Sequence, residues 1–288
     1  MTKSIKLPYR LLIYDIETHL ALRARIWRLG ENVIRHTQLD KAFSTNEIIC
    51  IQYKWYGDKT THVLSGTDMI EKFDALVKQS DATIGKNNHR FDVKHINTQR
   101  MMQKLPAYPE WTDTSDDLEK QLRKYFDFPS QSLDYVSELL GYGGKIKMDW
   151  QQWVEIGDRK HLLKYKDSKL FSPKQLEFIS QTECKKSYKS VIKDGLKSLH
   201  KMFFYGKKDV RDTEKVLQRV LPYIKLKHNA SEGEGCTVCG SQDIYPTKKV
   251  VIGKTRYKQF HCNKHEGYAG KRPYVSVGGH VKYTGKMG

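Results

Sequence analysis

Two carboxylates separated by one residue stand at the end of a predicted strand. Asp15 and Glu17 close the run 9–17, whose apolar residues are continuous enough for a central strand buried on both faces. Residues two apart in a strand project to the same side, so the two carboxylates repel unless a cation offsets their charge. Carboxylate oxygens are ligands that Mg²⁺ and Mn²⁺ take. The alternative is a strand end that carries two solvated acids.

Two more acids and a tyrosine stand on other predicted elements. A short strand over 82–85 leads through a polar turn to Asp92, which opens a predicted helix. Tyr205 and Asp209 are one helical turn apart and therefore share a face. Each also has a plain structural reading, in which Asp92 complements a helix dipole and Tyr205 is a core aromatic.

In their order and on their elements, these residues resemble a known family. Asp15-x-Glu17, the text Asn-x-x-x-Phe-Asp that ends at Asp92, and Tyr205-x-x-x-Asp209 resemble the three exonuclease motifs of the DEDD superfamily. The tyrosine makes the chain similar to the branch that includes the proofreading domain of family B DNA polymerases. The resemblance runs from about residue 9 to residue 224.

Other text fits the same family, with departures. Asp113-Thr114 resembles the family's Asp-Thr step, and 132–141 resembles the helix that precedes the third motif. Gly206 stands where the family often has Cys, and Lys86 and Arg90 stand where other members often have uncharged residues. None of these departures removes an acid.

The resemblance implies an α/β fold of the RNase H-like type. Its mixed sheet would combine a three-stranded antiparallel meander with parallel strands, flanked by helices. Strands are predicted over 9–17, 46–56, 61–65 and 82–85, and helices over 67–79, 91–102, 116–126, 131–141 and 209–221. The text from 149 to 204 is mostly helical and rich in Lys, and we favour a nucleic-acid channel over a merely solvated face for it.

The resemblance also implies a mechanism. Two Mg²⁺ or Mn²⁺ ions would be held by four acids, which are Asp15, Glu17, Asp92 and Asp209. Tyr205 would orient the attacking water, and the product would be a nucleoside 5′-monophosphate. Asn87 would contact the terminal nucleotide, with its neighbour Asn88 ranked below it.

Three polar residues near these motifs complete the site expectations. Lys145 and Lys147 lie in the basic segment 141–208 and are candidate substrate contacts. Asp212 lies almost one turn beyond the last motif acid, and we expect it to be a solvated helix acid rather than a member of the site.

A second set of metal ligands lies near the C-terminal end. Cys236-x-x-Cys239 is followed by a glycine, and Cys262 and His265 have the same spacing, so the text resembles a zinc ribbon with one structural Zn²⁺. His261 is the competing fourth ligand. Residues 236–288 are too few and too polar to fold around a core alone, which favours a metal. The five cysteines are an odd number and favour a reducing compartment over a disulfide framework.

The net charge of +18 is distributed unevenly. Residues 1–140 carry +1, 141–208 carry +9, 209–225 carry +1, and 226–288 carry +7. Basic residues interleaved with aromatics surround the cysteines, which favours nucleic acid over a protein-binding module or a solvated face. The basic residues are Lys248, Lys249, Lys254, Arg256, Lys258, Lys264, Lys271 and Arg272, and the aromatics are Tyr245, Tyr257, Phe260, Tyr268 and Tyr274.

The sequence therefore predicts an exonuclease domain over 1–227, a linker over 228–235 and a zinc-ribbon module for nucleic acid over 236–288. The expected function is metal-dependent 3′–5′ hydrolysis of DNA in replication, proofreading or repair. The alternatives are trimming of RNA 3′ ends and non-catalytic binding of nucleic acid by the same fold. Expected partners are a single-stranded or frayed 3′ end and replication proteins. With no apolar run long enough for a membrane and no signal peptide, we expect the cytoplasm of a bacterial or phage-infected cell.

Overall fold

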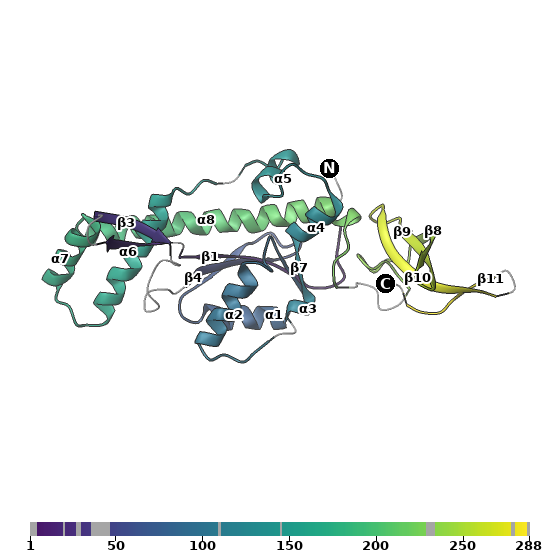
Figure 1. Cartoon of the computed structure of the whole chain (residues 1–288), viewed down its shortest axis with the longest axis horizontal. Coiled ribbons are helices and arrows are strands. Elements are labelled where there is room, and N and C mark those ends of the chain that lie inside the picture. Colours follow the sequence, from purple (N-terminus) through teal and green to yellow (C-terminus); the bar gives the residue numbers. More distant parts are fainter. Residues whose placement is uncertain are drawn as a thin grey trace.

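The computed structural model has an elongated shape built along one long helix, α8 (Tyr188–Val220). A mixed sheet lies beside α8, and a smaller sheet lies at one end of the molecule (Figure 1). The described residues are 5–19, 21–26, 30–35, 47–108, 111–144, 146–228, 234–277 and 280–286.

The main sheet has five strands in the order β5-β4-β1-β6-β7. Their bounds are β1 Leu11–Thr18, β4 Ile48–Trp55, β5 His62–Ser65, β6 Ala82–Gly85 and β7 Ser115–Asp117. The strands β1, β4 and β5 pair antiparallel, whereas β6 and β7 run parallel to β1. The predicted mixed sheet, with an antiparallel meander and parallel strands, is confirmed.

Strand β1 is central because its side chains are apolar on both faces. On one face, Leu11 and Ile13 pack in a core with α8 residues such as Val210. On the other face, Leu12 and Tyr14 pack in a second core that is shared with α1 and α2. Each buried side chain of this size contributes about 1.5–3 kcal/mol of hydrophobic stabilisation.

The helices cover both faces of this sheet. Those of the first part of the chain are α1 Met69–Lys78, α2 Asp92–Met102, α3 Trp111–Thr114, α4 Leu118–Tyr125 and α5 Leu133–Leu139. Then come α6 Trp150–Asp167 and α7 Pro173–Cys184, which both begin with a capping box. The residues Asp149 and Ser172 supply these caps, since each side chain accepts a bond from the third helical N–H.

Helix α8 is longer than the sequence indicates. Its single run takes in both the end of the basic text 149–204 and the helix predicted over 209–221. Gly195, inside α8, does not break the helix because it lies where α8 meets α6. A Cβ there would be 2.5 Å from the carbonyl oxygen of Glu155. The short helix η2 (Leu221–Tyr223), which contains Pro222, follows α8.

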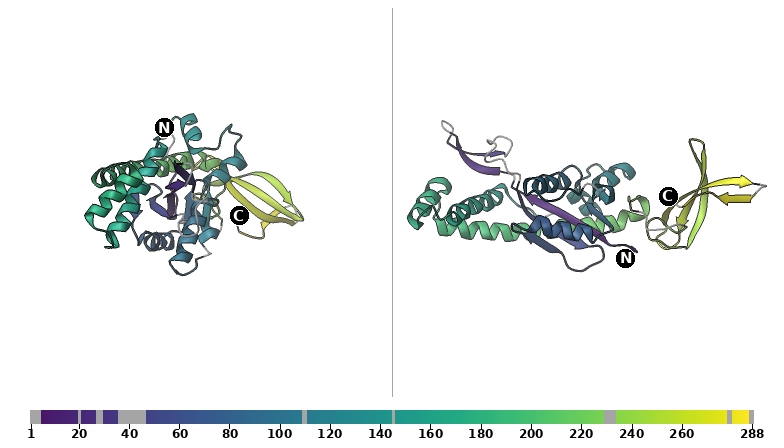
Figure 2. Two further views of the ribbon diagram at one scale, coloured as in Figure 1. Left: turned by 60° about the vertical axis from the view of Figure 1, so that its left-hand side comes forward. Right: turned by 90° about the horizontal axis from the view of Figure 1, so that it is seen from below.

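Three strands of the first half of the chain, β2 (Ala21–Ile26), β3 (Gly30–Arg35) and β7, have no counterpart in the sequence predictions. The strands β2 and β3 pair as a hairpin, and β2 contacts α6. The hairpin projects from the body of the molecule in the right-hand view of Figure 2. The three residues of β7 are Ser-Asp-Asp, so they carry no apolar pattern that predicts a strand. Among the described residues, no helix is long and apolar enough to cross a membrane.

The smaller sheet is antiparallel, in the order β11-β10-β9-β8. Its strands are β8 Ile244–Ile252, β9 Thr255–Cys262, β10 Gly267–Val277 and β11 His280–Tyr283. The sheet is docked on the end of α8, because a Cβ at Gly267 would be only 2.5 Å from the carbonyl oxygen of Pro222.

Candidate functional site

Asp15 and Glu17 lie on the face of β1 that α8 covers. Their partners in β4 are Gln52 and Cys50 respectively. Burial raises the pKa of the Cys50 thiol, and the nearby charges of Glu17 and Asp15 raise it further. The two acids and the two β4 side chains therefore share one side of the sheet.

The contact between β4 and α8 identifies this side. Lys54 of β4 forms a buried ion pair with Glu214 of α8, whose second oxygen accepts a bond of 2.6 Å from the Gly57 nitrogen. Gly206 of α8 lies directly over Gln52, because a Cβ at this glycine would be 2.4 Å from the Gln52 amide. Gly206 is thus a point where α8 approaches the sheet closely.

Asp92 reaches β1 from its other edge. Pairing of β1 with β6 stops at Ile13 and Ile84, so the next backbone groups of β1 have no neighbouring strand there. Asp92, the first residue of α2, accepts a hydrogen bond of 3.0 Å on Oδ1 from the Ile16 nitrogen. Burial raises the pKa of Asp92 to about 7.

Tyr205 and Asp209 both belong to α8, as the spacing predicts. Asp209 is buried and Tyr205 is half-buried, and α8 packs against β1 and β4. The structure therefore brings Asp92 into contact with β1 and places α8 over the face that carries Asp15 and Glu17. Metal binding by these acids stays a prediction.

The two asparagines in the loop between β6 and α2 have different environments. Asn88 is fully buried, and its amide nitrogen donates to the hydroxyls of Tyr14 and Ser115, both at 3.1 Å. Asn87 is half-buried and left-handed, with φ of 60°, and its backbone nitrogen donates to Asp117. Asn88 is committed to holding the strands together, so Asn87 is the better candidate for a substrate contact.

Asp116 and Asp117 are among the buried acids that the sequence analysis missed. Asp117 caps α4, since its side chain accepts from the Glu119 and Lys120 nitrogens. Asp116 accepts a bond of 2.8 Å from the Lys227 nitrogen, and burial raises its pKa to about 6. In the sequence, the one feature that could have indicated these two acids is their adjacency, which begins three residues after Asp113.

Several expectations are corrected or fall outside the structure. Asp113 and its neighbour Thr114 are exposed, so the Asp-Thr resemblance does not mark a buried site. Asp212 is not solvated: it is buried and pairs with Lys208 and with Lys215. The role of Lys147 in substrate binding stays a prediction, since this residue is exposed between α5 and α6, and Lys145 lies outside the described residues.

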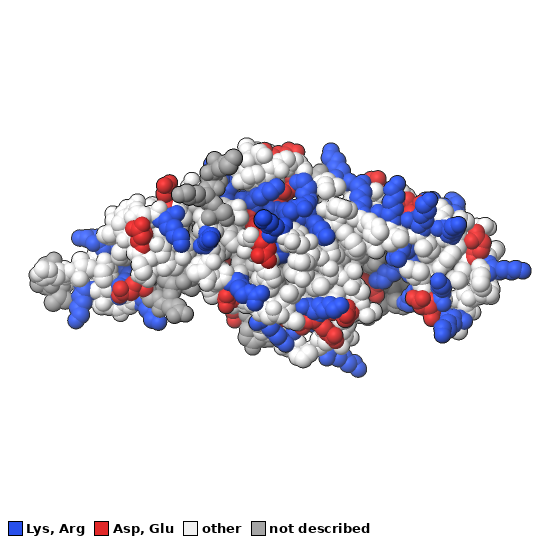
Figure 3. Space-filling model, turned by 180° about the vertical axis from the view of Figure 1, so that it is seen from behind, with Lys and Arg blue, Asp and Glu red and all other residues white. Residues whose placement is uncertain are grey.

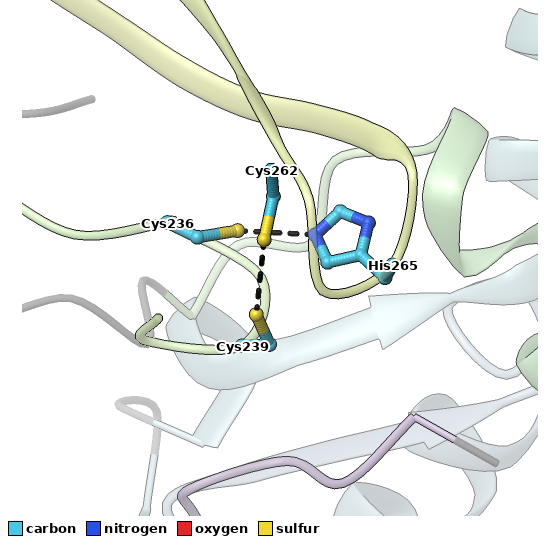
Figure 4. Close-up of side chains that lie close together, drawn as sticks. All are labelled: Cys236, Cys239, Cys262 and His265. Carbon is cyan, nitrogen blue, oxygen red and sulfur yellow. Dashed lines mark hydrogen bonds between the residues drawn. The ribbon is translucent and has the colours of Figure 1, made fainter. Parts of the chain in front are cut away.

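Four buried side chains form a cluster that could hold a metal ion. Each cysteine offers its Sγ and the histidine offers a ring nitrogen as the ligand atom. These four atoms all lie within 4.8 Å of one another (Figure 4). The cluster consists of Cys236, Cys239, Cys262 and His265. Within it, Cys236 Sγ lies 3.1 Å from His265 Nε2, and Cys239 Sγ lies 3.6 Å from Cys262 Sγ.

The chemistry of this cluster fits zinc. The Cys236–Gly240 turn is closed by a bond of 2.8 Å from the Gly240 nitrogen to the Cys236 carbonyl, and Gly240 has the positive φ of 69° that this turn requires. The hydrogen bond from Cys236 is the main cause that lowers the pKa of Cys239 to about 4, which favours a thiolate. Three sulfurs and one imidazole fill a tetrahedral site.

His261 is not part of the cluster. It lies in β9 next to Cys262, and adjacent residues of a strand project to opposite faces. Its partners across the sheet are Tyr245 and Tyr268. His265, in the turn between β9 and β10, is free of this constraint and reaches the cysteines.

Lys and Arg dominate the charge on the face drawn in Figure 3. They gather over the middle of the molecule and along the end formed by α6 and α7. This agrees with the uneven distribution of charge along the sequence.

Among known proteins, the comparisons found similarity to solved structures. No family model and no curated protein matches the chain. Solved structures that match include the family B DNA polymerase from the hyperthermophilic archaeon Pyrobaculum calidifontis, at 16% identity and a TM-score of 0.44. The match covers 75% of this chain and 25% of that polymerase, so the chain spans about a quarter of its length.

Proposed function

We propose that the chain is a metal-dependent 3′–5′ exonuclease that hydrolyses DNA. In this proposal, 1–227 form an RNase H-like exonuclease domain, 228–235 a linker and 236–288 a zinc ribbon. The observation that carries it is the bond from the Ile16 nitrogen to Asp92, which joins two of the three motifs at one point. The third motif lies on α8, which packs against the same strand.

The four acids fit hard divalent cations. Asp15, Glu17, Asp92 and Asp209 offer oxygen ligands, which suit Mg²⁺ or Mn²⁺. When bound, such ions lower the pKa of a coordinated water and stabilise the charge that develops on a leaving oxygen. The raised pKa of Asp92 means that this carboxyl must lose a proton before it can act as a ligand.

The remaining residues would position the reactants. The Tyr205 hydroxyl would hold the attacking water by a hydrogen bond, and Asn87 would contact the terminal nucleotide. The water oxygen forms a bond to phosphorus as the bond from phosphorus to the 3′-oxygen of the shortened strand breaks. The leaving oxygen takes a proton, the water gives one to solvent, and the product is a nucleoside 5′-monophosphate.

The zinc ribbon would have a structural role. All four ligand positions are filled by Cys236, Cys239, Cys262 and His265, so no open position remains for a substrate. The metal would hold the small sheet against the end of α8, where its apolar residues join the core that contains Leu221 and Ile224.

A product-ladder assay tests the exonuclease. Single-stranded DNA and RNA of one sequence, labelled at the 5′ end, are incubated with the protein in Mg²⁺ or Mn²⁺. We expect stepwise shortening of DNA that Asp15→Asn abolishes. Asp113→Asn is the matched control, because this acid is exposed, and it should leave the ladder intact.

Three outcomes contradict the proposal in different ways. Shortening of RNA alone assigns the chain to RNA trimming. Intact strands with a clear gel shift indicate a binding protein. Equal ladders from the parent and Asp15→Asn show that the four acids are not the site.

A further inference from the structure

Three lysines from three separate elements lie near the place where the small sheet joins the rest of the molecule. Strand β10 contacts η2 there, and the rings of Tyr223 in η2 and of Phe126, which follows α4, have centroids 5.8 Å apart. Lys225 follows η2, Lys271 belongs to β10, and Lys124 lies in the last turn of α4. Burial lowers the pKa of Lys225, and the charges of Lys271 and Lys124 lower it further. These like charges are close enough to destabilise one another, and an anion bound between them would relieve the repulsion.

The outer face of the small sheet continues this surface. Residues paired across antiparallel strands share a face, so the register defines rows that run across β8, β9 and β10. The rows are Tyr245, His261 and Tyr268; then Lys248, Gln259 and Lys271; then Val250, Tyr257 and Pro273. Aromatic and cationic rows therefore alternate on this face.

Contacts between side chains agree with the register. The rings of Tyr245 and His261 have centroids 6.0 Å apart, and Lys271 Nζ lies 4.9 Å from the centroid of the Tyr257 ring. On the opposite face of the sheet, Phe260 and Tyr274 are buried beside a row formed by Lys249, Lys258 and Arg272. The aromatic residues of the small sheet thus divide into a buried set and a set that faces outward.

The outward set reaches α4. Burial raises the pKa of Tyr268, and the nearby Tyr125 raises it further, so these two tyrosines are neighbours across the junction. Tyr125 is exposed, and Lys124 Nζ lies 5.1 Å from the centroid of its ring. The end of α4 repeats the pairing of a lysine with an aromatic ring that β9 and β10 show.

We infer that this junction face binds a single strand of nucleic acid. We define the junction face by Lys124, Tyr125, Lys225, Tyr257, Tyr268 and Lys271. The lysines would bind successive phosphates, and the tyrosine rings would stack on the bases. The inference rests on the proposed function for the choice of nucleic acid, but it places a binding surface away from the carboxylates and partly outside the zinc ribbon.

The alternation of charge and rings favours a single strand over other polyanions. A duplex hides the faces of its bases, so it would use the lysines and leave the rings without partners. An acidic polypeptide would likewise need only the charges. Only an unpaired strand presents a phosphate and a flat base at every step, which matches both kinds of side chain.

The first test measures binding without hydrolysis. Full-length protein carrying Asp15→Asn is titrated into labelled oligo(dT) in Ca²⁺, and fluorescence anisotropy gives the Kd. The triple variant Lys124→Gln, Lys225→Gln, Lys271→Gln should weaken binding by at least about tenfold and reduce the slope of log K against log salt by about 2, since each lost phosphate contact removes about 0.7. Zinc content and circular dichroism verify folding.

A matched control removes the same charge elsewhere. Lys59, Lys78 and Lys94 are exposed on other parts of the surface, and their triple change to Gln lowers the net charge equally. We expect it to change the Kd by no more than about twofold. Equal weakening by both triple variants, or no weakening by the first, overturns the inference.

The second test separates stacking from charge. Tyr257→Leu combined with Tyr125→Leu removes two base stacks and should weaken oligo(dT) binding by at least about tenfold, while an abasic strand of equal length binds unchanged. If the tyrosine changes have no effect and polyglutamate competes as well as oligo(dT), the face binds acidic polypeptide instead. If the ladder assay shows no shortening of DNA while the junction face still binds oligo(dT), the result contradicts the proposed exonuclease activity and leaves the binding face supported.

Discussion

Oδ1 of Asp92 lies 3.0 Å from the backbone nitrogen of Ile16, the residue between Asp15 and Glu17. This bond crosses 76 residues of sequence and fixes the first residue of α2 against the central strand. It forms where β6 has ended and no neighbouring strand remains to accept the Ile16 N–H. The position of one candidate metal ligand is therefore determined by the backbone that carries two others.

Asp92→Asn should lower the nuclease activity while leaving the stability of the fold nearly unchanged. The Asn oxygen can still accept the bond from Ile16, so the thermal midpoint should stay within a few degrees of the parent. Loss of the carboxylate should lower kcat by at least about 100-fold, which corresponds to about 2.7 kcal/mol. Nuclease assays beside thermal melting measure both. Activity close to that of the parent contradicts the role of Asp92 as a ligand.

Asp116 should make stability depend on pH. Its pKa in the folded protein is about 6, above the ordinary value near 3.8, so the folded state holds a proton that the unfolded chain has already lost. The stabilisation from Asp116 is therefore complete below about pH 4 and is lost as pH rises to about 6, by roughly 3 kcal/mol for two pKa units. In urea unfolding, Asp116→Asn should lack this part of the pH dependence. Parallel curves for the two proteins contradict the shift.

Gly206→Ala should move α8 away from the sheet. The new Cβ would be 2.4 Å from the Gln52 amide, which is fully buried and cannot swing into solvent. We expect a loss of about 1–3 kcal/mol in unfolding free energy, as for other overpacked cores. Gln52→Ala in the same chain should recover part of this loss, because it removes the clashing atoms. Losses that simply add in the double variant show that the two residues are not in contact.

Removing one partner of the ion pair between Lys54 and Glu214 should destabilise the fold strongly, whereas replacing both partners with apolar residues should not. Both side chains are buried, so Lys54→Met leaves an uncompensated charge and should cost about 3–5 kcal/mol. Adding Glu214→Leu should restore most of the stability. The exposed pair of Lys72 and Asp68, in and just before α1, is the control, and its removal should barely change the stability because water screens both charges. Denaturant unfolding compares the four proteins.

Zinc should be bound once per chain and should stabilise the small sheet. His265→Ala should lower the zinc content and loosen the sheet, whereas His261→Ala should leave the content at one, because His261 faces away from the cysteines. Atomic absorption gives the stoichiometry, and hydrogen exchange of β8 to β10 reports the loosening. Loss of zinc from His261→Ala alone contradicts the ligand set.

The sequence predicts best where one local pattern decides the structure. Strand β1 was predicted because its apolar residues serve two faces, and Tyr205 and Asp209 were placed on one helix by their spacing. The register of β9 would also have excluded His261, because alternation sends it to the face opposite Cys262.

Long-range contacts were beyond the sequence. The bond from Lys227 to Asp116 spans 111 residues, and nothing near Asp116 indicates that it is buried. The same holds for Asp212, whose burial depends on where α8 lies rather than on its neighbours. The three-residue strand β7 forms only because β6 offers it an edge, which its own polar residues do not predict.

The length of α8 has a consequence for how the molecule is made. The helix carries the last candidate acid and covers a strand from the beginning of the chain, so the site joins residues 15 and 209. The candidate site can therefore assemble only after α8 has been synthesised, because Asp209 lies on this helix. Nascent chains that end before α8 would expose the face of β1 and would lack the proposed nuclease activity.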